Sequence, residues 1–465
     1  MQLGDVLAQV TLGVANGHIE VSNIAIDSRA CTPGSLFFAL PGTTTHGLNF
    51  VDAAVANGAV VVVASSALDL PVPVIEVPES ELRVLVAQAC SALAGHPERG
   101  VDLIGVTGTN GKTSVTSFVA MLARAIGWNG SNIGTLTNER TTPSAPELFP
   151  SLAAIKAGFD MTAPRSVVAL EVSSHALDQD RLAGVTFNVA AFTNLTHDHL
   201  DYHGSLENYF EAKAKLFTPE RTKSAVIWCD DPYGERLAAH CAVPVLEVRR
   251  SDAEHVASSF SGTTFFWRSQ IVTTPIIGDY NVDNALMAMT IMSSLGVSDE
   301  LVAFAMSQLT PVPGRFEVLD AGLATVIVDY AHTPDGLRRL LASVRLLVPS
   351  QRVITVFGCG GDRDHLKRPE MGEVASANSD LTIVTSDNPR SESPDAIIES
   401  IMTGVVPWAS VYRVTDRRSA IERALSEASE GDVIVIAGKG HERSQIVGNE
   451  VLDFDDRAVV REWMG

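Results

Sequence analysis

Residues 106–115 read Val106-Thr-Gly-Thr-Asn-Gly-Lys-Thr-Ser-Val115, and this stretch predicts the fold of the chain around it. It follows an apolar run, 101–106, and precedes a helical pattern, 113–125. A glycine-rich loop between a strand and a helix predicts a phosphate site, because glycine lets backbone N–H groups close around the phosphate. Val106 stands where the strict phosphate-loop pattern has its first glycine, so a tight turn with an exposed lysine is the alternative.

The loop also predicts the ligand class. Lys112 can neutralise phosphate charge and the hydroxyl of Thr113 can hold Mg²⁺, which together indicate a nucleoside triphosphate. The expected nucleotide contacts are Gly108, Thr109, Asn110, Gly111, Lys112, Thr113 and Ser114.

Strand-like apolar runs alternate with helical patterns from residue 101 onward, as in doubly wound parallel sheets. The runs are 103–106, 167–172, 189–192 and 225–228, then, after a linker near 309–315, 326–328, 354–357, 381–384 and 433–436. Residues 1–98 contain shorter runs between turns rich in Gly, Thr and Pro. The sequence predicts an α/β protein of three domains: a small N-terminal α/β domain (1–98), a central P-loop-type ATPase domain with a mostly parallel sheet (99–310) and a Rossmann-like C-terminal domain (311–465).

Composition excludes several classes of partner. The 465 residues are 46% hydrophobic with a net charge of −21, which disfavours nucleic acid or an anionic membrane as the main partner. Apolar runs such as 59–64 are too short to cross a bilayer, and the N-terminus lacks a signal-peptide pattern. Five cysteines without metal-type spacing favour a reducing compartment. We expect a cytoplasmic monomer without membrane insertion.

Polar residues follow the central strand candidates, where ligands of such sheets bind. Glu171 and His199 can both reach a Mg²⁺ beside the phosphates. Zinc is the alternative suggested by His197, His199 and His203, but thiolate partners are missing. For His199 the alternative is a hydrogen-bonded core histidine. For Lys213, composition alone indicates a surface lysine whose aliphatic side chain packs on the protein while its amine reaches water.

In the C-terminal region, Arg363 and Arg390 each follow a strand candidate. A guanidinium is a fork-shaped donor suited to carboxylates, so the pair indicates a substrate with more than one carboxylate. Glu442, close to Gly438, can hold an ammonium. Surface ion pairing of the two arginines with nearby aspartates is the alternative.

Seven segments, in order along nearly the whole chain, resemble the Mur ligases. They are Gly108-Thr-Asn-Gly-Lys-Thr113, Glu171-Val-Ser-Ser-His-Ala-Leu177, Thr193-Asn-Leu-Thr-His-Asp-His-Leu-Asp-Tyr-His203, Asn281-Val-Asp-Asn284, Asp329-Tyr-Ala-His-Thr-Pro334, Gly358-Cys-Gly-Gly-Asp-Arg-Asp364 and Asp387-Asn-Pro-Arg390. The resemblance implies a ligase that activates a carboxylate with ATP to an acyl phosphate, which an amine then attacks.

The resemblance also implies roles for individual residues. Thr113, Glu171 and His199 match metal-site positions, Lys112 and Mg²⁺ supply positive charge near the reacting phosphate, and Lys213 matches a lysine that is carbamylated in this family and positions magnesium. Asn132 matches a polar position near the γ-phosphate, Asn281 and Asn284 match the adenine side, and Arg315, Asp329 and His332 match groups that close on ATP.

The implied acceptor is UDP-MurNAc-L-Ala-D-Glu. Its expected contacts are Ser28, Thr43, Thr44 and Thr45 for the uridine diphosphate, and Thr141, Thr142, Ser173, Gln179 and Arg181 for the muramoyl peptide. Arg140 precedes Thr141, where some family members carry asparagine.

The implied amino acid is meso-2,6-diaminopimelate, because Asp387-Asn-Pro-Arg390 resembles the form found in members that add it. Its expected contacts are Arg363, Asp387, Asn388, Pro389, Arg390, Gly438 and Glu442. The alternatives are an L-lysine-adding or D-Ala-D-Ala-adding Mur ligase, a folylpolyglutamate-type synthetase, and, from another class, a nucleotide-gated binding or switch protein.

Overall fold

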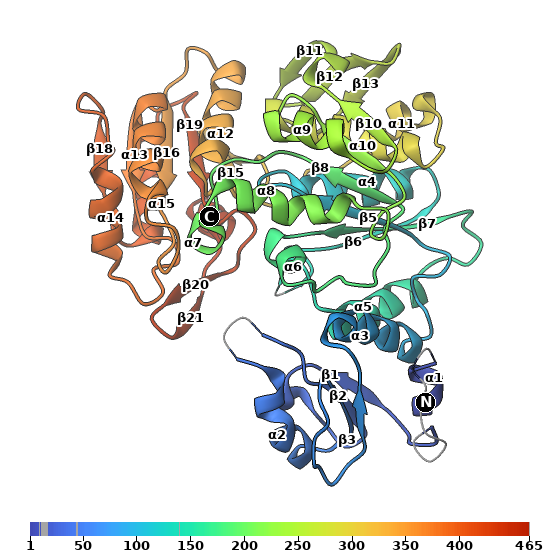
Figure 1. Ribbon diagram of the computed structural model, residues 1–465. Coiled ribbons are helices and arrows are strands. Elements are labelled where there is room, and N and C mark those ends of the chain that lie inside the picture. The colour runs from blue at the N-terminus through green and yellow to red at the C-terminus, as the bar shows by residue number, and fades with distance from the viewer. Residues whose placement is uncertain (9, 11–16, 43–44, 139, 465) are drawn as a thin grey trace.

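Three β-sheets with covering helices form the body of the protein in the computed structural model (Figure 1). The structure describes residues 1–8, 10, 17–42, 45–138 and 140–464. The fold class expected from the sequence, α/β with mostly parallel sheets, is confirmed. None of the described helices is long and apolar enough to span a membrane.

The N-terminal sheet has four parallel strands in the order β1-β2-β3-β4. Successive side chains of a strand point to opposite faces, so Leu36 and Phe38 lie on one face and Phe37 on the other. The elements are α1 (Leu3–Val6), β1 (Asn23–Ala25), β2 (Ser35–Phe38), α2 (Val51–Ala56), β3 (Ala59–Ala64), β4 (Val74–Glu76) and α3 (Glu79–Leu93).

The central sheet has six parallel strands in the order β10-β9-β8-β5-β7-β6, so the phosphate-loop strand β5 lies in its middle. Helix α10 packs against α4 on one face. The elements are β5 (Asp102–Thr107), α4 (Lys112–Ala125), β6 (Asn129–Ile133), α5 (Ala145–Ala157), β7 (Ser166–Glu171), α6 (Ser174–Asp178), β8 (Val189–Phe192), α7 (Leu200–His203), α8 (Leu206–Ala214), β9 (Ala225–Trp228), α9 (Pro232–His240), β10 (Val245–Val248), α10 (Asp279–Ser294) and α11 (Asp299–Met306).

A three-stranded antiparallel sheet covers part of this body, and the sequence patterns did not predict it. Its strands are β11 (Glu254–Ser259), β12 (Gly262–Trp267) and β13 (Gln270–Thr274). Phe265, Trp267 and Val272 are buried in the same core as α4 and α10. The sheet therefore completes the apolar core on that side of the central domain.

The C-terminal sheet has the strand order β14-β15-β19-β16-β17-β18, and only β14 is antiparallel to its neighbour. Ile327 and Val435 lie on the face covered by α12 and α13, whereas Val328 and Ile436 lie on the face covered by α15 and α16. The elements are β14 (Glu317–Ala321), β15 (Ala324–Asp329), α12 (Pro334–Leu347), β16 (Val353–Phe357), α13 (Lys367–Asn378), β17 (Leu381–Val384), α14 (Pro394–Met402), β18 (Val411–Arg413), α15 (Arg417–Glu427), β19 (Val433–Ala437), the hairpin β20 (Ser444–Val447) and β21 (Glu450–Asp453), and α16 (Asp456–Trp463).

The N-terminal and central bodies share one hydrophobic core. Helix α3 packs against α5, and side chains of both sheets belong to the same buried cluster (Figure 1). The C-terminal body contacts the central one through polar side chains around the carboxyl ends of the two six-stranded sheets and through Ile277, which packs in the C-terminal core with Phe316. The fold therefore brings two ligand-binding edges together.

A fully buried ion pair ties the last helix to the C-terminal sheet. Arg417 on α15 donates from Nε and Nη2 to the two carboxylate oxygens of Asp456 on α16, both at 2.8 Å. It also donates from Nη2 to the carbonyl oxygen of Ala437, at the end of β19. The pair therefore connects the start of α16 to α15 and to the end of β19.

We predict that Asp456→Ala lowers the free energy of unfolding by about 3–5 kcal/mol, because it leaves a buried guanidinium without its counter-charge. The matched control is Arg418→Ala, which removes an exposed pair with Glu462 and should cost about 0–1 kcal/mol. Urea and thermal unfolding measure both. Equal losses in the two variants would contradict the prediction.

Candidate functional site

One cavity of about 600 Å³ lies between the central and C-terminal sheets. The phosphate loop and the residues after β7 and β8 line it from the central side. The segments after β15, β16, β17 and β19 line it from the C-terminal side. The cavity thus joins the two edges that the sequence patterns identified separately.

The phosphate loop owes its shape to two glycines. Gly108 has φ +146° and Gly111 has φ +89°, values that side-chain-bearing residues rarely adopt. A Cβ at Gly108 would also collide with the Thr193 hydroxyl. Lys112 lies at the start of α4 and donates from Nζ to the carbonyl oxygens of Gly108 and Thr109, at 2.9 and 2.8 Å. The lysine therefore stays within the loop.

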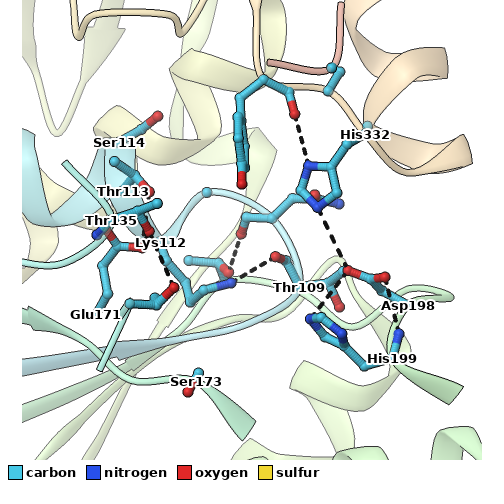
Figure 2. Close-up of a pocket in the computed structure, with 18 of the residues that line it drawn as sticks. Thr109, Lys112, Thr113, Ser114, Thr135, Glu171, Ser173, Asp198, His199 and His332 are labelled. Atoms are coloured by element: carbon cyan, nitrogen blue, oxygen red, sulfur yellow. Dashed lines mark hydrogen bonds and ion pairs between the residues drawn. The ribbon is translucent and has the colours of Figure 1, made fainter. Parts of the chain in front are cut away.

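Glu171, at the end of β7, is almost fully buried and gathers hydroxyl groups around its carboxylate (Figure 2). Thr113 donates to Oε2 at 2.9 Å, and the Thr135 backbone and hydroxyl donate to Oε1 and Oε2 at 2.9 and 3.2 Å. Arg315, from the C-terminal side, donates to the Thr113 hydroxyl at 3.1 Å. These oxygens form a compact hard-donor set directly beneath the phosphate loop.

Lys213 is buried against the phosphate loop and is not among the residues that line the cavity, so the surface interpretation from composition is wrong. Its Nζ donates to the carbonyl oxygen of Gly108 at 2.9 Å and lies 4.4 Å from the centre of the Tyr209 ring. Burial, with the nearby charge of Lys112, holds the pKa of Lys213 well below its usual range. Burial also lowers the pKa of Lys112, although the charges of Glu171 and Asp198 oppose the shift.

Asp198 gathers basic groups from both domains. Its carboxylate lies 3.5 Å from His199 Nε2, 3.9 Å from His332 Nε2 and 3.8 Å from Lys367 Nζ. Figure 2 shows His199 and His332 on opposite sides of it. Burial opposes its ionisation, but these basic neighbours and the hydrogen bond from the His199 backbone N–H outweigh burial and hold the pKa of Asp198 below its usual range. Burial lowers the pKa of His199, which favours a neutral imidazole.

The donor set near the phosphate loop suits a magnesium ion that keeps part of its water shell. Among the described residues, no group of three or more His, Cys, Asp or Glu side chains is arranged to hold a metal. The available protein ligands are instead the Thr113 hydroxyl, the Glu171 carboxylate and the neutral His199 imidazole. Such a sparse set fits Mg²⁺ bound to phosphate, and it gives no support to a zinc site.

The C-terminal wall carries the residues expected to bind an amino acid. Arg363, Asp387, Asn388, Arg390 and Glu442 all line the cavity. Arg390 has φ +51° and donates from Nη1 to the carbonyl oxygen of Gly361 at 2.7 Å. The backbone of β20 pairs with the Arg390 segment, since Arg390 N donates to Ile446 O and Gly448 N donates to Arg390 O. The β20–β21 hairpin thus holds this segment in place.

Most of the residues named in the sequence analysis line the cavity. Beyond those above, they include Thr109, Asn110, Ser114, Thr141, Thr142, Ser173, Arg181, Asn284, Asp329 and Gly438. Asp329 is nevertheless engaged by protein donors, since it accepts from Tyr280, Phe316 N and Ala331 N at 2.7–2.8 Å.

Some expected contacts lie outside the cavity lining. Asn132 is on β6, an outer strand of the central sheet, and Asn281 lies behind Asn284, whose Nδ2 donates to its Oδ1. Gln179 does not line the cavity but accepts from Arg181 through Oε1 at 2.9 and 2.7 Å. Ser28 and Thr45 belong to the N-terminal domain, Pro389 lies behind its neighbours, and Thr43 and Thr44 fall outside the described residues.

Several cavity residues escaped the sequence analysis as site residues. They are Thr135, Arg140, His175, Asp198, Asp283, Tyr330, Arg339, Asp364 and Lys367. Asp198 and Asp364 adjoin residues that were named, so proximity in sequence was an available signal. Lys367 and Arg339 lie on helices, where only the tertiary fold directs them to the cavity.

Comparisons with protein families match all three bodies. Residues 20–98 match the Mur ligase family catalytic domain, 106–292 the Mur ligase middle domain, and 314–440 the Mur ligase glutamate ligase domain. UDP-N-acetylmuramoyl-L-alanyl-D-glutamate–2,6-diaminopimelate ligases of Gloeobacter violaceus and Geobacillus kaustophilus are 44% and 43% identical to the chain. The first alignment covers 99% of this chain and 98% of the relative, and the second covers 96% and 95%.

Solved structures of Mur ligases and of a related synthetase also resemble this chain. A structure of a ligase of the same name superposes with a TM-score of 0.70 at 30% identity, covering 100% of this chain and 98% of the other. MurF ligase from Thermotoga maritima in complex with ADP has a TM-score of 0.63 at 18% identity and 96% coverage of both chains. Folylpolyglutamate synthase of Mycobacterium tuberculosis, complexed with ADP and AMPPCP, has a TM-score of 0.60 at 20% identity, covering 76% of this chain and 92% of the other. The last two share the fold.

We predict a pH-dependent stability that arises from Asp283 in the cavity wall. Burial raises its pKa to about 7, although the charges of Arg250 and Arg339 oppose the shift. Because an unfolded aspartate has a pKa of about 3.9, the unfolded chain loses a proton between roughly pH 4 and 7 that the folded chain keeps. Stability therefore falls as pH rises through this window, by at most about 1.4 kcal/mol per pH unit.

The test compares urea unfolding of the wild type and of Asp283→Asn at pH 5 and pH 8. Asparagine has the shape of aspartate but does not ionise. The variant should therefore have a higher free energy of unfolding than the wild type at pH 8, and the difference between the two proteins should be smaller at pH 5. An identical pH dependence in both proteins would refute the assignment.

Proposed function

Because the chain belongs to the Mur ligase family, we propose that it is an ATP-dependent ligase that joins meso-2,6-diaminopimelate to UDP-MurNAc-L-Ala-D-Glu. The observation that carries the proposal is one cavity lined by the phosphate loop on one side and by a wall that includes Arg363 and Arg390 on the other. The full-length relatives whose names state this reaction support it.

The reaction has two chemical steps. An oxygen of the D-glutamyl side-chain carboxylate attacks the γ-phosphorus of ATP, the bond to the β-phosphate oxygen breaks, and an acyl phosphate and ADP form. The amine then attacks the acyl carbon, loses a proton, and phosphate leaves through a tetrahedral intermediate. Lys112 and Arg315 lie beside the phosphate loop, where their charges stabilise the negative charge that develops in both steps.

Thr113, Glu171 and His199 are the residues that would hold a magnesium ion. When bound, the ion would neutralise phosphate charge and polarise the reacting phosphoryl group. The protein side chains contribute the geometry: Glu171 fixes the Thr113 hydroxyl, and burial keeps His199 neutral and able to donate a lone pair.

Lys213 fits a carbamylated lysine. Only an unprotonated amine reacts with carbon dioxide, and the lowered pKa of Lys213 increases that fraction. The carbamate would be an anion beside the ammonium of Lys112, which would stabilise it and relieve the repulsion between the two amines. It would then act as a further oxygen donor near the metal.

The acceptor would lie along Thr141, Thr142, Ser173 and Arg181, with its nucleotide toward Ser28 and the turn near Thr45 in the N-terminal domain. Arg140 and Arg181 both line this side of the cavity, which suits an anionic peptide. We further propose that the enzyme acts as a cytoplasmic monomer, in keeping with its composition.

The C-terminal wall would hold one end of the amino acid. Arg363 and Arg390 would bind a carboxylate, and Asp387, Asn388 and Glu442 would bind the adjoining ammonium. L-Lysine would leave both arginines without a partner at this end, and a buried polar site discriminates strongly against such a ligand. A folylpolyglutamate-type activity is the weaker candidate, since that similarity lies at the level of fold.

The decisive experiment measures ADP formation by the purified protein with UDP-MurNAc-L-Ala-D-Glu and either meso-diaminopimelate or L-lysine. We expect activity with diaminopimelate and a kcat/KM for lysine lower by at least about 100-fold. Equal use of lysine would overturn the amino-acid assignment. ADP formation with folate substrates, together with none from UDP-MurNAc-L-Ala-D-Glu and either amino acid, would overturn the reaction.

Arg390→Ala should raise the KM for diaminopimelate by roughly 10- to 100-fold, because it removes a charge-assisted contact to the substrate carboxylate. The KM for ATP should change by less than about twofold, since Arg390 lies on the opposite wall of the cavity from the phosphate loop. Steady-state kinetics with each substrate varied in turn provides the comparison. An equal rise in the KM for diaminopimelate and the KM for ATP would count against a role of Arg390 in binding the amino acid.

Lys213→Ala should lower kcat by about 100-fold or more, as expected for loss of a group that positions charge at the reacting phosphate. Acetate should partly restore the variant's activity, because a free carboxylate can occupy the space that the carbamate fills. Lys213→Arg, which keeps a cation, is the matched control and should not respond to acetate. Rescue of neither variant, together with an unmodified Lys213 in active enzyme, would exclude carbamylation.

A further inference from the structure

Lys439 is a fully buried lysine directly behind the C-terminal wall of the cavity. Its Nζ donates to Asn388 Oδ1 at 3.1 Å and to Glu442 Oε2 at 2.9 Å, and lies 3.5 Å from Asp387 Oδ1. All three partners line the cavity, whereas Lys439 does not. The lysine can therefore influence a ligand only through these residues.

The first effect of Lys439 is to orient the Asn388 amide. Asn388 Oδ1 accepts from Lys439 Nζ and from Ile446 N, both donors, so the carbonyl end of the amide must point at them. The Nδ2 end then donates to Glu442 Oε2 at 3.0 Å. A flipped amide would place N–H groups against an ammonium and a backbone N–H, so the orientation is unique.

The second effect concerns charge. One ammonium lies among two carboxylates, Asp387 and Glu442, so this group of three side chains carries one net negative charge. Asp387 Oδ1 is buried and has no hydrogen-bond partner among the described residues. One remaining negative charge matches one incoming ammonium. Without the lysine, the two negative charges would repel each other.

A structural role alone does not explain this lysine. A buried ion network is seldom more stable than well-packed apolar side chains of the same volume. The turn around Lys439 is made by Gly438 and Gly440, with φ of +115° and +52°, and does not require a charge between them.

We infer that Lys439 is a positioning residue for the amine end of the amino-acid substrate. It presents Asn388 and Glu442 in one fixed arrangement and sets the charge of the ammonium pocket at −1. The inference rests on the proposed ligase function and adds a specificity-determining residue to it.

The test is the kinetic comparison of the wild-type enzyme with Lys439→Met, which keeps the length of the side chain and removes its charge and donors. We expect the KM for diaminopimelate to rise about tenfold or more, while the KM values for ATP and UDP-MurNAc-L-Ala-D-Glu change less than about twofold. Lys439→Gln, which retains N–H donors, should restore part of the affinity, and serves in place of the methionine variant should that one not fold.

Two controls separate a positioning role from a general loss of structure. Arg345→Met removes an ion pair with Asp380 elsewhere in the same domain and should leave the KM for diaminopimelate unchanged. The double variant Lys439→Met with Glu442→Gln provides the second control. Its loss of affinity for diaminopimelate should be smaller than the sum of the losses in the two single variants, because the lysine acts through that carboxylate.

An unchanged KM for diaminopimelate in Lys439→Met, or a parallel rise in the KM values of all three substrates, would overturn the inference. Failure of the proposed function is a different result, since the wild type itself would then form no ADP with diaminopimelate.

Discussion

A buried carboxylate, Glu171, is the constraint on which the site depends. A carboxylate at the end of a parallel strand, with almost no exposure, needs donors, and here they come from the phosphate loop, through Thr113, and from the segment after β6, through Thr135. Arg315 then reaches the same threonine from the C-terminal side. One buried carboxylate thus fixes the phosphate loop and the segment after β6, and it supports one of the contacts between the two domains.

The two junctions between domains differ in physical character. The N-terminal and central bodies share an apolar core through α3 and α5, which resists relative movement. The central and C-terminal bodies meet through polar contacts such as His197 with Asp364 at 3.0 Å and Lys367 with Asp198, and share only a smaller apolar contact at Ile277. Polar interfaces of this kind permit domain motion.

How well each segment could be predicted from the sequence depends on how deeply it is buried. Strands buried on both faces read as continuous apolar runs, so 189–192, 225–228 and 381–384 coincide with β8, β9 and β17. Strand β6, Asn129-Gly-Ser-Asn-Ile133, has one apolar residue because it lies at an edge, and it was missed. Lys213 was recognisable only by resemblance, since a helical lysine between apolar residues has the same local pattern whether its amine meets water or a buried carbonyl.

The distribution of charge explains how so acidic a protein can accommodate polyanions. The chain carries a net charge of −21, yet eight Lys and Arg and eight Asp and Glu residues line the cavity, so the lining is close to neutral before its histidines are considered. The excess negative charge therefore lies elsewhere. Lys112 and Arg315 gather at the phosphate loop, whereas Asp387 and Glu442 lie on the far wall with Arg363 and Arg390. Both ends of the cavity therefore carry charges of both signs, and each charge acts mainly within a Debye length of about 8 Å at physiological ionic strength.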